Sequence, residues 1–175
     1  TSTLDKEDAG LYHTYAEVAA ELQQIESTHS DIAKVYDIGG SIEGRDILAI
    51  KISDNVTIEE TSEANVLYMG CHHAREWISV EIPMHLTNFL VDNYGTDPTI
   101  TKLVDERQTW IVPIVNPDGL EYSQNVYTMW RKNKRDNDND GVFERNFDGV
   151  DNNRNYGYKW GYDNIGSSPN PGDET

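Results

Sequence analysis

The 175-residue sequence has one cysteine, few basic residues and no long apolar run. Cys71 alone cannot form an intrachain disulfide, and without a Cys-x-x-Cys pair the chain has no zinc knuckle and no dithiol redox motif. No window approaches the ~20 consecutive apolar residues of a membrane span. The polar stretch that begins at Thr1 also differs from an uncleaved signal peptide. These absences exclude a disulfide framework and predict that the chain does not span a membrane.

Basic residues are outnumbered by acidic ones. Lys and Arg number 14 against 31 Asp and Glu, which gives a formal net charge of −17. A negative field of this size repels nucleic-acid phosphates and anionic lipid, so we expect neither a nucleic-acid nor a membrane partner. Apolar residues make up 37% of the chain, which is typical of one globular domain.

The apolar pattern of the first 70 residues predicts a helix followed by three strands. Apolar residues recur every three or four positions within residues 12–29, which is the periodicity of an amphipathic helix. Residues 33–39 and 46–53 flank a glycine-rich connection and predict a hairpin. Residues 65–70 are almost continuously apolar, which indicates a buried central strand.

The next segments alternate between helix and strand patterns. A helix is expected over residues 77–94, with its regular part starting near Ser79 because Pro83 is tolerated in a first turn, and with Gly95 ending it. A shorter helix over 98–107, a strand over 109–115 and a turn at 116–119 follow. From residue 121 the chain is expected to be mostly loop. The alternation predicts an α/β fold with a mixed sheet, and the long final loop indicates a functional segment or a domain that continues past Thr175.

The turn between the strand at 65–70 and the following helix carries a candidate metal-binding pair. His73 and Glu76 are three residues apart, and an imidazole nitrogen and a carboxylate oxygen both suit Zn²⁺. α/β sheets present their sites at such turns. Taken alone, the pair better fits a surface histidine beside a helix-start glutamate that the helix dipole favours. His72 competes for the ligand role but is one residue out of phase with Glu76.

Two arginines lie among aromatic and amide side chains near the end of the sequence. Arg131 follows a Met-Trp pair, and Asn153 directly precedes Arg154. Amide and guanidinium donors side by side can grip a carboxylate through two hydrogen bonds. Each arginine by itself also fits an exposed residue that neutralises an acidic loop.

Four motifs in a fixed order resemble one family. The segments are GCHHAREW, IVNPDGLEY, MWRKN and GVDNNRNYGYKWG, and the similarity runs from about Gly10, through SIEGRDILAIKISDN, to SSPNPGDET. The chain resembles the zinc metallocarboxypeptidases of the carboxypeptidase A type, with bacterial carboxypeptidase T as the most similar branch. The resemblance implies an α/β/α sandwich with a mixed sheet that is C-terminally truncated. Residues 1–9 form a polar N-terminal segment, and residues 10–175 form the N-terminal part of a single catalytic domain.

The resemblance implies a metal centre and a peptide-binding site. His73 and Glu76 match two of the three zinc ligands, and Asp151 matches the carboxylate that orients the zinc-binding histidine. The matches that face the substrate are Arg75, which lines the approach of the chain, Arg131, which stabilises the oxyanion, and Asn153 with Arg154, which bind the free C-terminal carboxylate. Peptide or protein C-termini are therefore the expected partners.

The family's third zinc ligand and its general-base glutamate correspond to positions beyond residue 175. His85 is no substitute, because it lies about half a turn away from Glu76 on the predicted helix. We expect a weak two-ligand zinc site and no peptidase turnover from the chain as given. The incomplete sheet would expose apolar surface, so we expect self-association or pairing with the missing C-terminal portion.

The acidic run that begins at residue 136 resembles the first half of a calcium loop. Alternate carboxylates are followed by Gly141, but Phe147 occupies the place of the final bidentate glutamate, so a solvated acidic insertion is the alternative. Calcium binding in the carboxypeptidase T branch favours Ca²⁺. The candidate ligands are Asp136, Asp138, Asp140, the carbonyl of Val142, and Glu144.

The predicted function is hydrolysis of the C-terminal peptide bond of peptides and proteins by a zinc-dependent carboxypeptidase. Two alternatives stay open. One is a zinc amidohydrolase that acts on small acyl-amino acids, and the other is a non-catalytic calcium-binding or adhesive module on the same scaffold. The resemblance also implies an extracellular, secreted protein.

Overall fold

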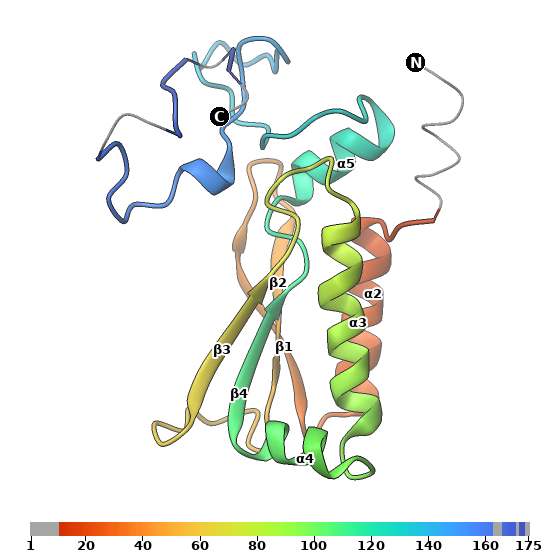
Figure 1. Ribbon diagram of the computed structural model, residues 1–175. Coiled ribbons are helices and arrows are strands. Elements are labelled where there is room, and N and C mark those ends of the chain that lie inside the picture. Colours follow the sequence, from red (N-terminus) through yellow and green to blue (C-terminus); the bar gives the residue numbers. More distant parts are fainter. Residues whose placement is uncertain (1–10, 163–165, 171, 174–175) are drawn as a thin grey trace.

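Figure 1 shows the computed structural model, which describes residues 11–162, 166–170 and 172–173. Four strands form one mixed sheet in the order β1-β2-β4-β3. The β1–β2 and β2–β4 pairs are antiparallel, whereas β3 and β4 are parallel. The mixed α/β class is confirmed. The strands are β1 (Ala33–Gly40), β2 (Asp46–Ile52), β3 (Ala64–Met69) and β4 (Arg107–Val112).

Two long helices lie along one face of this sheet (Figure 1). They are α2 (Tyr15–Thr28) and α3 (Ile78–Asn93), while the shorter α4 (Pro98–Asp105) and α5 (Pro117–Asn125) lie at opposite ends of the sheet. Val18, Leu22 and Ile25 of α2 and Val80 and Met84 of α3 pack against the inner face of the strands to form the core. None of the helices that the structure describes is long and apolar enough to cross a membrane.

The first helix begins later than the apolar pattern alone predicts, because Thr14 caps it. The Thr14 hydroxyl accepts a hydrogen bond from the Glu17 amide at 3.3 Å, and the Glu17 carboxylate accepts one from the Thr14 amide at 2.8 Å. This reciprocal capping box satisfies two amides that have no partner within the helix. The helix expected over 12–29 is confirmed, with its first residue fixed at Tyr15.

The prediction that residues 65–70 form a buried central strand is wrong for the described chain. β3 lies at the edge of the sheet, and Leu67, Tyr68 and Met69 are 57%, 46% and 43% exposed. The sequence indicated a strand that is covered on both faces. Within the described residues, no strand pairs with the outer edge of β3 and no helix covers the face opposite α2 and α3.

The turn expected at 116–119 is instead the start of α5. Asn116 is the N-cap, with its side chain accepting a hydrogen bond from the Gly119 amide, and Pro117 occupies the first helical position. Proline is favoured there because its missing N–H has no intrahelical partner to lose. Asn-Pro fits both a turn and a capped helix start, so the prediction of a turn at this position is wrong. The mostly loop segment expected from residue 121 starts at 126, because α5 continues to Asn125, and beyond it the described chain is irregular apart from the short 3-10 helix η1 (Asn152–Arg154).

His13 attaches the segment before α2 to the body of the protein. Its Nδ1 lies 2.7 Å from a Glu81 carboxylate oxygen, and its Nε2 lies 3.0 Å from Glu21. Burial opposes the charged form, but the hydrogen bonds and charges of Glu81 and Glu21 outweigh it and raise the pKa of His13 above 6.5. His13 therefore bridges α2 and α3, and both carboxylates favour its charged form.

We expect the stabilising effect of His13 to depend on pH. Because its pKa is higher in the folded chain, the contribution is fully present below about pH 6.5 and is lost as the pH rises through the raised value. For these partly exposed groups, solvent screening limits it to about 1 kcal/mol. Urea unfolding of wild type and His13→Gln from acid to alkaline pH should show a difference in unfolding free energy that disappears on the alkaline side. A difference in unfolding free energy that stays constant with pH would contradict this.

Candidate active site

The candidate site lies beyond the carboxyl ends of the parallel pair β3 and β4. Gly70 links the two chain segments there, because its amide donates to Val112 O at 2.9 Å and its carbonyl accepts from the Val115 amide at 3.0 Å. The segment that leaves β3 carries residues 71–76 and enters α3, and the segment that leaves β4 enters α5. This edge is where α/β sheets place ligand-binding residues.

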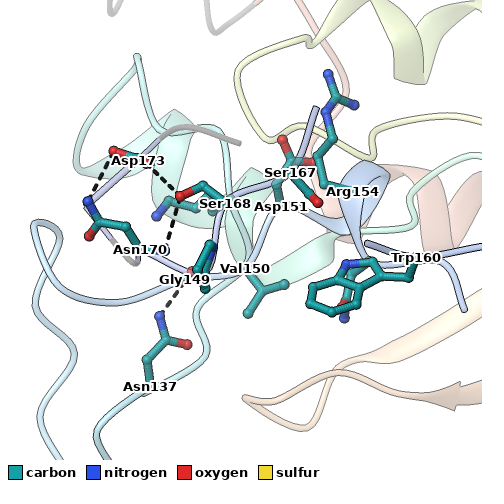
Figure 2. A pocket seen from close by; sticks show the side chains of 13 residues that line it. Asn137, Gly149, Val150, Asp151, Arg154, Trp160, Ser167, Ser168, Asn170 and Asp173 are labelled. Atoms are coloured by element: carbon teal, nitrogen blue, oxygen red, sulfur yellow. Dashed lines mark hydrogen bonds between the residues drawn. The ribbon is translucent and has the colours of Figure 1, made fainter. Parts of the chain in front are cut away.

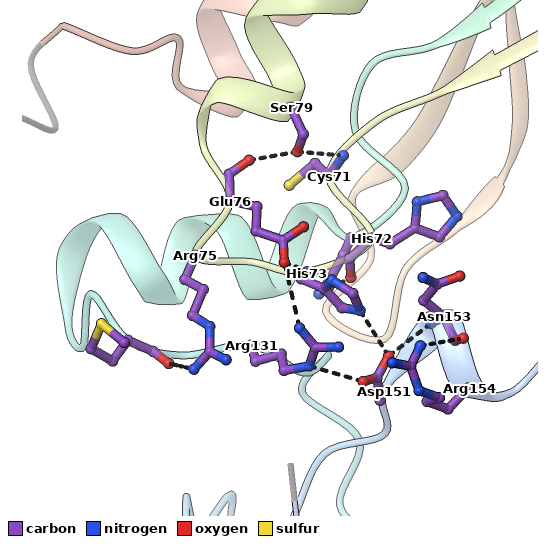
Figure 3. A network of polar contacts seen from close by, with 12 residues as sticks. Cys71, His72, His73, Arg75, Glu76, Ser79, Arg131, Asp151, Asn153 and Arg154 are labelled. Carbon is purple, nitrogen blue, oxygen red and sulfur yellow. Dashed lines mark hydrogen bonds and ion pairs between the residues drawn. The ribbon is translucent and has the colours of Figure 1, made fainter. Parts of the chain in front are cut away.

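His73 and Glu76 point toward one another in this loop (Figure 3). The Nδ1 atom of His73 lies 2.9 Å from Glu76 Oε1, and His73 Nε2 lies 3.1 Å from Asp151 Oδ1. His73 is buried, whereas Glu76 is partly open to solvent. The imidazole therefore has one nitrogen beside each carboxylate.

This donor set fits Zn²⁺. Two ligand atoms that each lie about 2 Å from one ion are about 3 Å apart, which matches the separation of His73 Nδ1 and Glu76 Oε1. A zinc-bound histidine usually donates its other ring N–H to a carboxylate, and Asp151 occupies that position. In the part of the chain that the structure describes, no third acidic, histidine or cysteine side chain joins these two as a metal-binding group.

Asp151 connects the metal-binding pair to the substrate-facing residues. Besides contacting His73, its carboxylate accepts hydrogen bonds from Arg131 Nε at 3.0 Å and from the backbone N–H of Asn153 at 2.9 Å. The side chain of Asp151 is 1% exposed, so these charge-assisted bonds are formed away from water. Asp151 also caps η1, which carries Asn153 and Arg154. One buried carboxylate thus fixes three separate chain segments.

The arginines surround this centre in different ways (Figure 3). Arg131 Nη1 lies 3.4 Å from Glu76 Oε1, so its guanidinium faces both carboxylates of the site. The Arg154 Nη1 atom donates to Asn153 O at 3.0 Å, while Arg75 reaches the opposite side and donates to Met129 O at 3.2 Å. The structure therefore brings Arg131 to the metal-binding pair, places Asn153 and Arg154 beside Asp151, and holds Arg75 at the edge of the group.

A polar pocket of about 350 Å³ opens beside Asp151 (Figure 2). Arg154 and Trp160 lie on one side of it, and Ser168 and Asp173 contribute its far side. The Ser168 hydroxyl donates to Asp173 at 2.6 Å. The pocket adjoins the arginine expected to bind a carboxylate, and its mixture of an aromatic surface with a few polar groups is typical of ligand sites.

The two residues that precede His73 are also shaped by burial. Burial and the adjacent His73 lower the pKa of His72 below 6.5, and its Nε2 lies 2.7 Å from the Tyr156 hydroxyl. Burial raises the pKa of the Cys71 thiol to about 12, so Cys71 stays a neutral, packed side chain at neutral pH. Tyr156 is a further residue near the site, which lies within the last of the four motifs without a role assigned to it.

The acidic loop gathers a different set of carboxylates from the one predicted. Ligand atoms of Asp136, Asp138 and Asp148 lie within 4.8 Å of one another, whereas Asp140 accepts from the Val142 amide at 2.8 Å. Asp148 is buried and accepts from the backbone amide of Glu144 at 2.7 Å, so Glu144 contacts the group through its backbone. The sequence missed Asp148 because it lies one position past the expected end of the loop.

A second acidic group lies at the other end of the sheet, and the sequence analysis did not find it. Asp54, Glu60 and Glu63 offer oxygens within 4.8 Å of one another. Burial, together with the charges of Glu60 and Asp54, raises the pKa of Glu63. The three residues come from the irregular connection between β2 and β3, which has no periodic pattern from which such a cluster could be read.

Sequence and structure comparisons identify the family. The zinc carboxypeptidase profile matches residues 18–175. The chain belongs to the zinc carboxypeptidase family. A zinc carboxypeptidase from Saccharothrix mutabilis subsp. capreolus is 40% identical over 152 residues, which are 86% of this chain and 33% of that protein.

Solved carboxypeptidase structures share the fold. Carboxypeptidase A from Helicoverpa armigera has a TM-score of 0.80 and 30% identity, over 94% of this chain and 37% of its own. Bovine thrombin-activatable fibrinolysis inhibitor, in complex with a tick carboxypeptidase inhibitor, has a TM-score of 0.76 and 25% identity, over 93% of this chain and 49% of its own. The chain spans about a third of the length of this curated relative, the Saccharothrix zinc carboxypeptidase. Zinc is the metal that the family implies.

Proposed function

We propose that this chain contributes the zinc-binding and carboxylate-binding half of a metallocarboxypeptidase that hydrolyses the C-terminal peptide bond of peptides and proteins. The observation that carries the proposal is the Asp151 carboxylate, which joins the metal-binding histidine, Arg131 and the Asn153 amide in one buried network. A metal-binding pair, a cation for an oxyanion and donors for a carboxylate are the parts that exopeptidase chemistry requires.

The described residues divide the work of such a reaction. Asn153 and Arg154 bind the free carboxylate of the substrate, which places the last peptide bond next to His73 and Glu76. Arg131 donates hydrogen bonds to the carbonyl oxygen as negative charge develops on it. Arg75 contacts the substrate peptide where it approaches the site. Bound Zn²⁺ would supply Lewis acidity toward the carbonyl and an activated water.

The chain as given holds two of the zinc ligands, and we propose that it has a weak zinc site and no peptidase turnover. Among the described residues, Glu76 is the one carboxylate beside His73 Nδ1. Because Glu76 is assigned as a zinc ligand, it does not also serve as the general base. A third ligand and a general base would come from a portion that follows these residues in longer relatives.

We propose that this portion, or a second copy of the chain, covers the exposed apolar edge. A groove of about 650 Å³ runs between β3 and α3 and is lined mainly by apolar side chains. Tyr68, Met69, Ile78, Ile82 and Phe89 line it and are each more than 40% exposed. An uncovered apolar edge of this kind favours association.

The substrate proposal is tested by supplying the missing portion in a longer protein and measuring zinc-dependent release of the last residue. A blocked dipeptide with a free carboxylate should be cleaved, and its amide should not. Arg154→Ala should raise KM, whereas Arg131→Ala should lower kcat. Equal cleavage of acid and amide would contradict the proposal, and a preference for acetylated single amino acids would favour the amidohydrolase alternative.

We further propose that the loop over residues 136–148 binds Ca²⁺ and that the protein acts outside the cell. The three converging carboxylates of Asp136, Asp138 and Asp148 support calcium, since hard oxygen ligands suit this ion. The extracellular location rests on the family resemblance alone. A calcium-dependent rise in melting temperature that Asp148→Asn removes would support the first proposal, and no rise in wild type would overturn it.

A further inference from the structure

The helix α5 lies directly against the loop that carries His73, at the end of the sheet where β3 and β4 stop (Figure 1). Two of its side chains reach the backbone carbonyls on either side of His73. Asn116 Nδ2 donates to His72 O at 3.3 Å, and Ser123 Oγ donates to Ala74 O at 2.6 Å. Both side chains belong to buried residues, so water does not compete for these bonds.

Asn116 uses its whole side-chain amide in this position. Its second N–H donates to Lys132 O at 3.1 Å, and its oxygen accepts from the Gly119 amide at 3.1 Å. A Cβ at position 119 would overlap with Asn116 Nδ2 and lie 2.6 Å from Lys132 O, so glycine is needed where the two meet. Because Lys132 follows Arg131, one amide group connects the His73 loop with the segment of the oxyanion-binding arginine.

Ser123 closes a second connection around the same loop. The indole N–H of Trp77, the residue after Glu76, donates to Ser123 Oγ at 2.8 Å. The hydroxyl has a single hydrogen to donate, and Ala74 O at 2.6 Å is a nearer acceptor than Leu120 O at 2.9 Å. The backbone between the two metal-binding residues and the side chain that follows Glu76 are thereby tied to one point on α5.

The helix itself is anchored independently of the metal site. Asp118 of α5 accepts from Ser41 Oγ at 2.7 Å, from the Glu43 amide at 2.9 Å and from Arg45 Nη1 at 2.7 Å. Its side chain is 3% exposed. These bonds fix the start of α5 to the β1–β2 hairpin turn, so α5 is a rigid base for the contacts it makes with the His73 loop.

We infer that Asn116 and Ser123 are positioning residues that hold the His73 backbone so that Nδ1 faces Glu76 and Nε2 faces Asp151. The inference rests on the proposed function, because it assigns a role to α5 at the proposed zinc site. Fixing the carbonyls of His72 and Ala74 limits rotation of the peptide unit directly before the ligand and of the unit that begins one residue after it. The ring is then orientated before metal binds, which spares the entropy of ordering it.

The test compares two variants with two matched controls. Asn116→Asp has the same shape but loses both donors, and Ser123→Ala loses the hydroxyl. Gln108→Glu and Thr87→Val make the same changes at buried sites away from the loop, where Gln108 donates to Glu60 O and Thr87 donates to Pro83 O, both at 2.9 Å. Each protein is titrated with zinc by calorimetry, well below its melting temperature.

We expect about a tenfold or greater loss of zinc affinity in Asn116→Asp and in Ser123→Ala. The controls should lose comparable thermal stability and keep their zinc affinity within about twofold. If Asn116 and Ser123 had only a structural role, their variants would keep zinc affinity as the controls do. Unchanged affinity in both α5 variants would overturn the inference.

A metal-free readout separates this inference from the proposed function. Nitrogen chemical shifts of the His73 ring should indicate one fixed hydrogen-bonded state in wild type and in the controls, and averaging in the two α5 variants. If wild type binds no more zinc than His73→Ala, the two-ligand zinc site fails, and the ring shifts alone decide whether α5 positions His73. Identical ring shifts in all five proteins would then overturn the inference.

Discussion

Asp151→Ala is expected to lower the free energy of unfolding by about 3 kcal/mol, because it removes one partner of a buried charge pair. Its carboxylate accepts from Arg131 Nε and lies 3.1 Å from His73 Nε2, with its side chain 1% exposed. The variant also removes the group that orients His73, so zinc affinity should fall by about 10- to 100-fold. Chemical denaturation and zinc titration measure the two effects.

The matched control for this variant is Asp97→Ala. Asp97 is also an N-cap, and its side chain accepts from the Thr99 and Ile100 amides at the start of α4. Losing that cap should cost about 1 kcal/mol and leave zinc affinity unchanged. If both substitutions lower the free energy of unfolding by the same amount and neither changes zinc affinity, Asp151 acts as a helix cap alone, and its assigned place in the metal site is wrong.

Gly70→Ala is expected to destabilise the fold by about 3 kcal/mol through steric overlap. Pro83 lacks the N–H that would pair with Ser79 O inside α3, and Gly70 packs against that carbonyl. A Cβ at Gly70 would overlap with Ser79 O and lie 2.8 Å from Pro113 O and 2.9 Å from Pro83 Cγ. The backbone would have to move at the point where β3 leads into the His73 loop.

Thermal and urea unfolding of Gly70→Ala, compared with Gly157→Ala, check this expectation. A Cβ at Gly157 meets nothing within 4 Å, so that substitution should change stability by less than about 0.5 kcal/mol. Equal stability of the two variants would contradict the expectation. It would show that α3 and the strand ends can move apart at Gly70 without a loss of stability.

Local signals in the sequence predicted most elements, and long-range context explains the errors. The apolar spacing predicted α2, and the Thr14 and Glu17 pair set where it begins. The same reasoning failed for β3, because an apolar strand is compatible with a central or an edge position and only its neighbours decide. It failed for α5 because Asn116 and Pro117 suit both a turn and a helix start.

The candidate site shows the same division. Motif order assigned roles to His73, Glu76, Arg131 and Asp151, and the structure brings all four together. Their supporting contacts were not predictable, because a bond such as that from Ser123 to Ala74 O ends on a backbone carbonyl, which every residue type carries. Groups that are recognised by side-chain chemistry are visible in a sequence, whereas groups that position the backbone become visible in the fold.

Zinc titration of the chain and of His73→Ala, by calorimetry at matched pH with calcium present, tests the two-ligand zinc site most directly. We expect measurable binding that His73→Ala abolishes and that His85→Ala, in the exposed groove between β3 and α3, leaves unchanged. Indistinguishable titrations of wild type and His73→Ala would contradict it, because zinc would then bind elsewhere on the acidic surface or not at all.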